Sequence, residues 1–82
     1  MNYYVLALRD LRADNYLPPM YVPNIAIAIR DVSDVLKEKA NEIAWAKHPE
    51  DYELYQLGIW DNDTSEFTPL NKRLYLLSEL KG

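Results

Sequence analysis

A helical turn that runs into an alternating strand dominates the middle of the sequence. Pro49 suits the first position of the turn, because its φ is preset and it has no N–H to lose. Glu50 and Asp51 follow it, where exposed N–H groups favour negative charge. From Glu53 to Trp60 the side chains alternate with the period of two that a strand requires. One side would carry Tyr55, Leu57 and Ile59, and the other Leu54, Gln56, Gly58 and Trp60.

A hairpin turn is predicted directly after this strand. The side chains of Asp61–Thr64 bond to their own backbone and tolerate the left-handed conformation, which favours a turn into a second strand, Ser65–Thr68. The same run has the spacing that opens a calcium loop. However, Glu66 stands where a glycine is needed, and Lys72 stands where a carboxylate would close the site. No metal site is therefore predicted.

The first half of the sequence predicts a strand, a loop and a helix. Asn2–Arg9 is apolar on both faces, which places it in the interior of a small sheet. Asp14–Pro19 predicts a loop, because its adjacent prolines hold the chain extended and withhold two donors. Asn24 is a good N-cap for a helix that ends at a break near Asn41 or continues to about Ala46. The apolar stripe of this helix is formed by Ile25, Ile29, Val32 and Leu36.

The predicted fold class is α+β, in a single domain that spans residues 1–82. The small three-stranded sheet would contain Asn2–Arg9, Glu53–Trp60 and Ser65–Thr68. One main helix, Asn24–Glu38, would pack on one face, and a right-handed βαβ connection favours parallel pairing of the first two strands. The C-terminal part would add either a short helix on Leu70, Leu74, Leu77 and Leu80 or an edge strand over Leu74–Leu77.

The start of the main helix carries more apolar surface than one small sheet can cover. A chain of 82 residues has a thin core, and without cysteine its stability must come from packing or from a partner subunit. Ile27 lies off the apolar stripe, so this turn is either sandwiched between the sheet and another element or buried between subunits. We expect a symmetric homodimer, formed through Ile25 and Ile27 or through an exposed edge strand.

Residues for catalysis and cofactor binding are scarce. His48 is the only histidine, and its place before Pro49 suits a cap or turn residue. Gly58 and Gly82 are the only glycines, so no loop is available to cradle a phosphate. We predict no catalytic residue, no cofactor and no enzyme activity. No apolar run approaches the roughly 20 residues that cross a bilayer, so no membrane partner is expected.

Charge is distributed unevenly along the chain. The net charge of −4 argues against binding along a phosphate backbone, which depends on many Lys and Arg contacts. Residues 31–70, with ten carboxylates and three lysines, carry −7, whereas both ends of the chain are positive. Either this pattern serves an ordinary solvated surface, or the ends form a mildly positive binding surface. If single-stranded DNA is bound, the expected phosphate-binding and stacking residues are Arg9, Arg12, Arg30, Lys72 and Arg73, with Tyr16 and Tyr21.

The segment Lys47–Gly58, followed by Asp61–Thr64, resembles the core of a family of small nonstructural proteins. These proteins belong to gokushovirus-type microviruses (Microviridae), which are tailless phages with circular single-stranded DNA genomes. Looser similarities lie at Arg9–Asp10, Ala13–Asp14, Leu17–Pro19, Asn24 and Ala28–Arg30. The chain departs from the family pattern at Trp60, where many relatives resemble Phe, and at Ser65, where a glycine is frequent. A longer or tighter hairpin is therefore expected.

The resemblance implies a non-enzymatic factor that acts in the host cytoplasm, in genome replication or packaging. Such a factor would help to move genome synthesis from duplex to single-stranded product. Its direct ligand would be single-stranded DNA or the phage replication initiator protein. The alternative is a protein-interaction module with a scaffold or host partner and no nucleic acid. The resemblance implies no catalytic residue.

Overall fold

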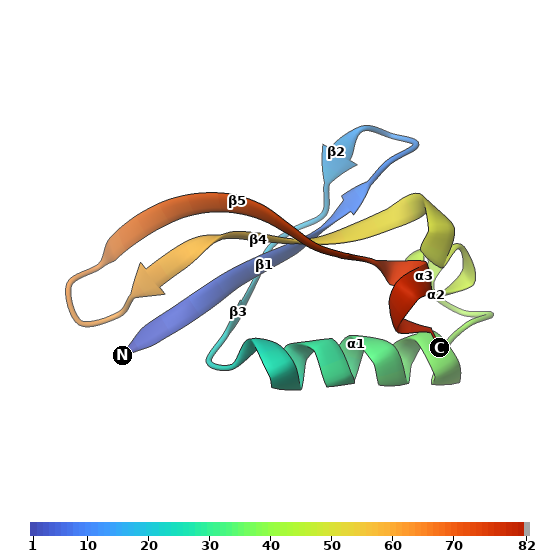
Figure 1. Cartoon of the computed structure of the whole chain (residues 1–82), viewed down its shortest axis with the longest axis horizontal. Coiled ribbons are helices and arrows are strands. Elements are labelled where there is room, and N and C mark those ends of the chain that lie inside the picture. Colours follow the sequence, from blue (N-terminus) through green and yellow to red (C-terminus); the bar gives the residue numbers. More distant parts are fainter. Residues whose placement is uncertain (82) are drawn as a thin grey trace.

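The computed structural model describes residues 1–81 and shows a twisted five-stranded antiparallel sheet that is covered on one face by helices (Figure 1). The strands are β1 (Asn2–Asp10), β2 (Asn15–Tyr16), β3 (Met20–Val22), β4 (Tyr52–Asp61) and β5 (Glu66–Leu76). Their order is β2-β1-β4-β5, and β3 also pairs with β1. The α+β class is confirmed, whereas the expected three-stranded sheet omitted β2 and β3.

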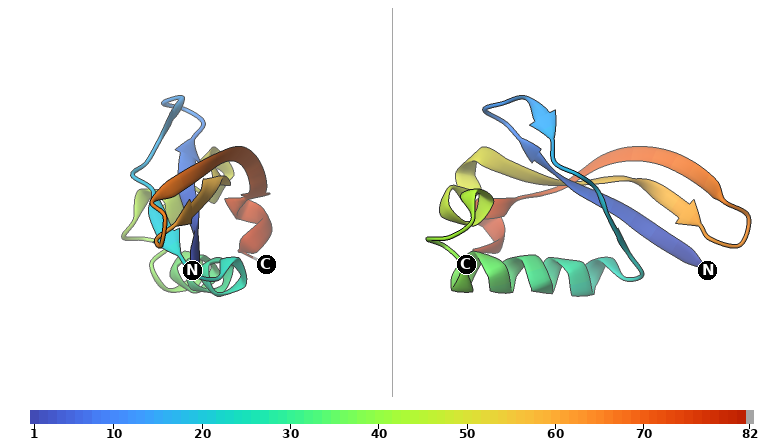
Figure 2. Two further views of the ribbon diagram at one scale, coloured as in Figure 1. Left: turned by 90° about the vertical axis from the view of Figure 1, so that its left-hand side faces the viewer. Right: turned by 180° about the vertical axis from the view of Figure 1, so that it is seen from behind.

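Helices pack along one face of this sheet. They are α1 (Ile25–Glu38), α2 (Ala44–Lys47), the 3-10 turn η1 (Pro49–Asp51) and α3 (Leu77–Leu80). As predicted, Asn24 caps α1, because its side chain accepts a hydrogen bond of 3.3 Å from the Ile27 N–H. Figure 2 shows α1 lying below the sheet in both further views. No helix among residues 1–81 is long and apolar enough to span a bilayer.

The core lies between the sheet and α1. It is formed by Leu6, Leu8, Ala28, Val32, Leu36, Ala46, Leu54 and Leu77, all nearly or fully inaccessible to solvent. On α1 the buried residues recur every four positions, which is the stripe spacing of an amphipathic helix. The helix ends at Glu38, so the predicted break before Ala46 is correct and the longer alternative is wrong.

The predicted parallel pairing of the first strand with the strand from Glu53 to Trp60 is wrong. β1 and β4 are antiparallel, with Asn2 opposite Asp61 and Asp10 opposite Tyr52. The reason is β3, which returns the chain to the start of β1 and places Val22 opposite Tyr4. α1 then runs forward along β1, so β4 enters at the far end and has to run back.

The last strand is much longer than predicted. The hairpin after Asp61 is confirmed, with Glu66 opposite Asp61, but β5 continues to Leu76 instead of ending at Thr68. The helix proposed over Leu70–Leu80 is therefore restricted to its final turn, α3, where the Glu79 carboxylate accepts a hydrogen bond of 2.7 Å from the Leu76 N–H. The edge-strand alternative was correct for residues 74–76, because pairing with β4 outweighs the leucine spacing.

A bulge at Leu57 changes the faces of β4. Val5 pairs with Gly58 and Leu6 pairs with Gln56, which leaves Leu57 as an extra residue. Side chains after the bulge are thereby moved to the opposite face from the one that strict alternation gives. The predicted separation of Tyr55 from Trp60 is wrong for this reason.

Candidate functional site

The face of the sheet turned away from α1 carries most of the aromatic side chains. We name it the open face. On β1, Tyr3, Val5, Ala7 and Arg9 point to it, because they alternate with the core residues Leu6 and Leu8. Their cross-strand partners share this face. Its rings are those of Tyr3, Tyr16, Tyr21, Tyr55, Trp60 and Phe67.

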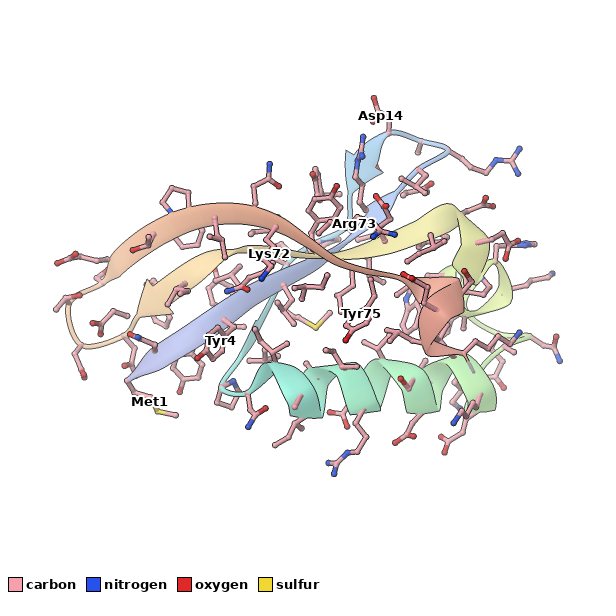
Figure 3. All side chains as sticks on the ribbon, viewed as in Figure 1. Met1, Tyr4, Asp14, Lys72, Arg73 and Tyr75 are labelled. Carbon is pink, nitrogen blue, oxygen red and sulfur yellow. The ribbon has the colours of Figure 1, made fainter. Side chains whose placement is uncertain are left out.

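One cluster of the open face combines two tyrosines with two arginines. The rings of Tyr16 and Tyr55 meet edge to face, with their centroids 5.6 Å apart. The Arg9 guanidinium lies over the Tyr16 ring, 5.9 Å from its centroid. Arg73 is paired with Tyr55 across β4 and β5. The Arg73 guanidinium therefore reaches the same end of the face (Figure 3). We name this set the arginine–tyrosine cluster.

Each of the two arginines is paired with carboxylates. Glu53, whose side chain is only 14% exposed, lies between them, 3.9 Å from Arg9 and hydrogen-bonded to Arg73. Asp14 accepts a further hydrogen bond of 2.6 Å from Arg9. The pKa of Arg9 is raised mainly by Asp14, and that of Arg73 is raised mainly by Glu53. A phosphate would have to compete with these carboxylates.

A second cluster lies at the other end of the open face and contains no charged side chain. The Trp60 ring contacts Tyr3, at 5.9 Å between centroids, and Tyr21, at 5.7 Å and nearly perpendicular. Phe67, paired with Trp60, lies over Gly58, where an added Cβ would collide with the Phe67 ring. Glycine is therefore required under this ring. We name Tyr3, Tyr21, Trp60 and Phe67 the tryptophan cluster.

The structure brings together only part of the predicted DNA-binding set. Arg9, Arg73 and Tyr16 meet in the arginine–tyrosine cluster, and Tyr21 lies in the tryptophan cluster. The other members are separated from them. Arg12 is on the β1–β2 turn, 3.7 Å from Asp51, Arg30 is on the solvent side of α1, and Lys72 points to the helix side of β5 through its pairing with Gln56.

Sequence reasoning missed Tyr3, Tyr55, Trp60, Phe67 and Glu53 as members of one surface. The alternation of β1 was available as a signal for Tyr3. Gly58, an isolated glycine in a strand pattern, was an available signal for the neighbouring bulge at Leu57, which brings Tyr55 and Trp60 to one face. No signal in the sequence located the close approach of Glu53 to two arginines.

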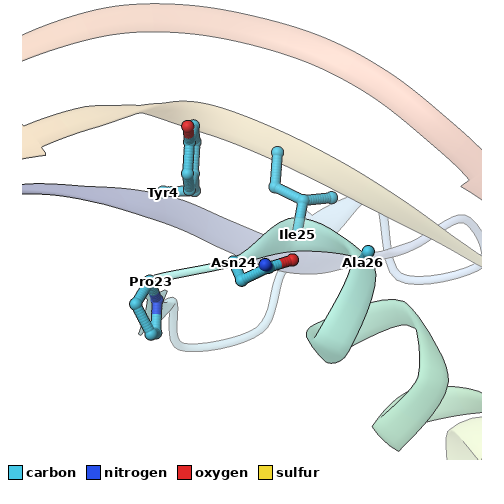
Figure 4. A pocket seen from close by; sticks show the side chains of 5 residues that line it. All are labelled: Tyr4, Pro23, Asn24, Ile25 and Ala26. Atoms are coloured by element: carbon cyan, nitrogen blue, oxygen red, sulfur yellow. The ribbon is translucent and has the colours of Figure 1, made fainter.

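The expected dimer residues lie at the opposite side of the molecule. The Ile27 side chain is 47% exposed, whereas Ile25 is half-buried and packs against the core. Ile25 also lines a shallow pocket of about 260 Å³ beside the start of α1 (Figure 4). The other lining residues are Tyr4, Pro23, Asn24 and Ala26.

The residues around η1 contain the lone histidine. Potential ligand atoms of His48, Glu50 and Asp51 lie within 4.8 Å of one another. His48 and Glu50 are exposed, and the nearest His48–Glu50 contact is 3.7 Å. His48 directly precedes η1, as predicted from the sequence, but its side chain makes no capping hydrogen bond there. Its backbone N–H donates to the Ala44 carbonyl at the end of α2.

The fold and the open face define a small α+β protein with an uncovered aromatic sheet surface. The model of a family described as Phage ORF5 protein matches residues 3–80 of the chain. The chain therefore belongs to this family of phage proteins. No curated protein matches it significantly. No solved structure does so either.

Proposed function

We propose that this phage protein is a nonstructural factor that binds single-stranded DNA on the open face of its sheet. The observation that carries the proposal is the gathering of aromatic rings on an uncovered face that has two arginines at one end. Aromatic faces beside cationic groups bind unpaired bases with little sequence preference, because every base has a π-face. Duplex DNA offers no such exposed bases.

The proposal also covers the biological setting. The chain is taken as a member of the gokushovirus-type microvirus group, acting in the host cytoplasm during genome replication or packaging. Its membership of a phage family and the motif at Lys47–Gly58 support this setting. The proposed role is non-enzymatic.

A second candidate is a protein-interaction module that binds the replication initiator, a scaffold or a host partner. The observation that favours it is the pairing of Arg9 and Arg73 with Glu53 and Asp14, which leaves the arginine–tyrosine cluster close to electroneutral. An aromatic surface with its arginines already paired also suits the centre of a protein interface.

Affinity for fluorescently labelled single-stranded DNA, measured at two salt concentrations, separates the candidates. The test variant replaces Arg9 and Arg73 by Ala. The matched control replaces Arg30 and Lys72 by Ala, which removes the same charge away from the open face. Each lost phosphate contact should flatten the salt dependence by about 0.7 in the log–log slope.

We expect the test variant to bind single-stranded DNA more weakly and with a shallower salt dependence than the wild type. The control variant should bind about as the wild type does. Equal binding by both variants would locate the DNA elsewhere. Absence of binding by the wild type at low salt would favour the protein partner.

A further inference from the structure

The tryptophan cluster leaves much of its aromatic surface exposed to solvent. Trp60, Tyr3 and Tyr21 are outside the core between sheet and helix. Tyr21 is 54% exposed and Phe67 is 48% exposed. Rings that only filled a core would be buried, as Leu6 and Leu54 are.

Two residues of β1 lie between the clusters on this face. Val5 and Ala7 are 2% and 0% exposed, so the side chains around them cover them. Ala7, which is opposite Tyr55, lies four positions along β1 from Tyr3, which is opposite Trp60. At about 3.3 Å per residue, the clusters are about 13 Å apart.

Only the arginine–tyrosine cluster carries charged side chains, so the two clusters should contribute different interactions with DNA. Arg9 and Arg73 can contact phosphates at one end, while the rings around Trp60 offer only stacking. Binding at the second cluster should therefore depend little on salt, because stacking releases no counterions.

We propose that the tryptophan cluster is a second base-stacking subsite, so that one single strand lies along the open face and contacts both clusters. This inference rests on the proposed function. A single strand advances roughly 3.4 Å per nucleotide when stacked, so about four nucleotides are needed to reach from one cluster to the other.

Trp60 is also a spectroscopic reporter of its own subsite. The test titrates the protein with oligothymidylates of about two and about twelve nucleotides, of which only the longer can span the face. Tryptophan fluorescence reports stacking, and anisotropy of labelled DNA reports binding. In Trp60→Phe a stacking ring is kept and the reporter is lost, while Trp45 packs against the core and serves as the internal background.

The longer strand should quench the wild type and bind Trp60→Phe with similar affinity but without the quench. Trp60→Leu and Tyr21→Ala should each lose about tenfold in affinity for the longer strand with an unchanged salt slope. Tyr75→Ala, on the helix side of β5, is the matched control and should bind as the wild type does. Circular dichroism confirms that each variant is folded.

Two outcomes would overturn the inference, and they are distinguishable. Binding by anisotropy without quenching, and with unchanged affinity in Trp60→Leu and Tyr21→Ala, rejects the second subsite and retains the proposed function. No anisotropy change with the wild type at low salt rejects both.

Discussion

Glu53 is the residue that most restrains the open face, because one carboxylate engages both arginines of the arginine–tyrosine cluster. Its low exposure strengthens these interactions relative to those of a fully solvated pair. Replacing it by Gln keeps the size of the side chain and removes its charge. Arg73 then loses its hydrogen-bonded carboxylate while Arg9 keeps Asp14, so the cluster gains one net positive charge for a phosphate.

We therefore expect Glu53→Gln to bind single-stranded DNA more tightly and with a steeper salt dependence than the wild type. Anisotropy titrations at two salt concentrations measure both quantities. The control is Glu42→Gln, which changes the net charge equally but affects only the exposed pair with Lys39. Indistinguishable titrations of the two variants would show that Glu53 does not restrain binding.

The stabilising contribution of Asp61 to the hairpin turn depends on pH, because its carboxylate must be charged. Its pKa is lowered from the ordinary value of 3.8, first by the Asp63 N–H, which donates to it at 2.9 Å, with contributions from Thr64 and the Met1 ammonium group. A lowered pKa means that the folded state favours the charged carboxylate. The stabilisation is present in full above pH 3.8 and is lost as the pH falls through the lower pKa of the folded state.

Asp61→Ala should accordingly lower the urea midpoint of unfolding at neutral pH, with the difference from wild type shrinking as the solution is acidified below about pH 3.8. Urea titrations at several pH values test this. Asp34→Ala, on the exposed side of α1, serves as the control. A difference that stays constant down to pH 2 would indicate a purely conformational role for Asp61.

At the level of single side chains, the sequence located some of the candidate site and missed its centre. Arg9, Arg73, Tyr16 and Tyr21 were selected because of their charge and aromatic character, and they do lie on the open face. The grouping of Tyr55 with Trp60 depends on one extra residue in β4. An isolated glycine such as Gly58 indicates a bulge or a close backbone approach nearby, but it does not identify the extra residue.

Among the elements, β5 is the edge strand whose outer backbone groups could pair with another chain. Two features oppose that pairing. Pro69 offers no N–H, and Asn71 adopts a left-handed conformation with φ 57° at an irregularity in the pairing with β4. Bulges and prolines of this kind are common protections of exposed edges.

The left-handed conformation of Asn71 should be sensitive to substitution. Asn71→Val should lose about 1–2 kcal/mol of unfolding free energy, because a branched side chain clashes in this conformation, whereas Asn71→Gly should be close to neutral. Chemical denaturation measures both. Thr68→Val, on the same strand without a positive φ, is the control. Equal stability of the Val and Gly variants at position 71 would contradict the assignment of strain.

The element boundaries were predicted well where local chemistry determines them. Asn24 as the cap of α1, Pro49 as the start of η1 and the hairpin after Asp61 all follow from side chains that act on nearby backbone. β3 was missed, because Met20–Val22 carries no strand pattern long enough to detect. That omission reversed the predicted direction of β4.

On the scale of the whole molecule, the exposed Ile27 side chain at the start of α1 bears on whether the protein forms a homodimer. Both edges of the sheet are short or protected, so the start of α1 is the better candidate for a homodimer interface. Ile27→Glu should then give a folded monomer, and light scattering measures the mass. Leu70→Glu, at an exposed apolar position of β5, should leave the mass of the wild type unchanged.

A wild type that is already monomeric at micromolar concentration would reject the homodimer. Dissociation by Leu70→Glu instead of Ile27→Glu would move the interface to the edge strand.

The central position of β1 also has a consequence for synthesis of the chain. β1 is synthesised before all of its strand partners, and β2, β3 and α1 come between it and β4, its longest partner. Until β4 emerges, Val5, Leu6, Ala7 and Leu8, which are almost fully buried in the native fold, have only β2 and β3 as strand partners. β1 can therefore complete its pairing only after β4 has been synthesised, and until then the nascent chain presents its most apolar strand to chaperones.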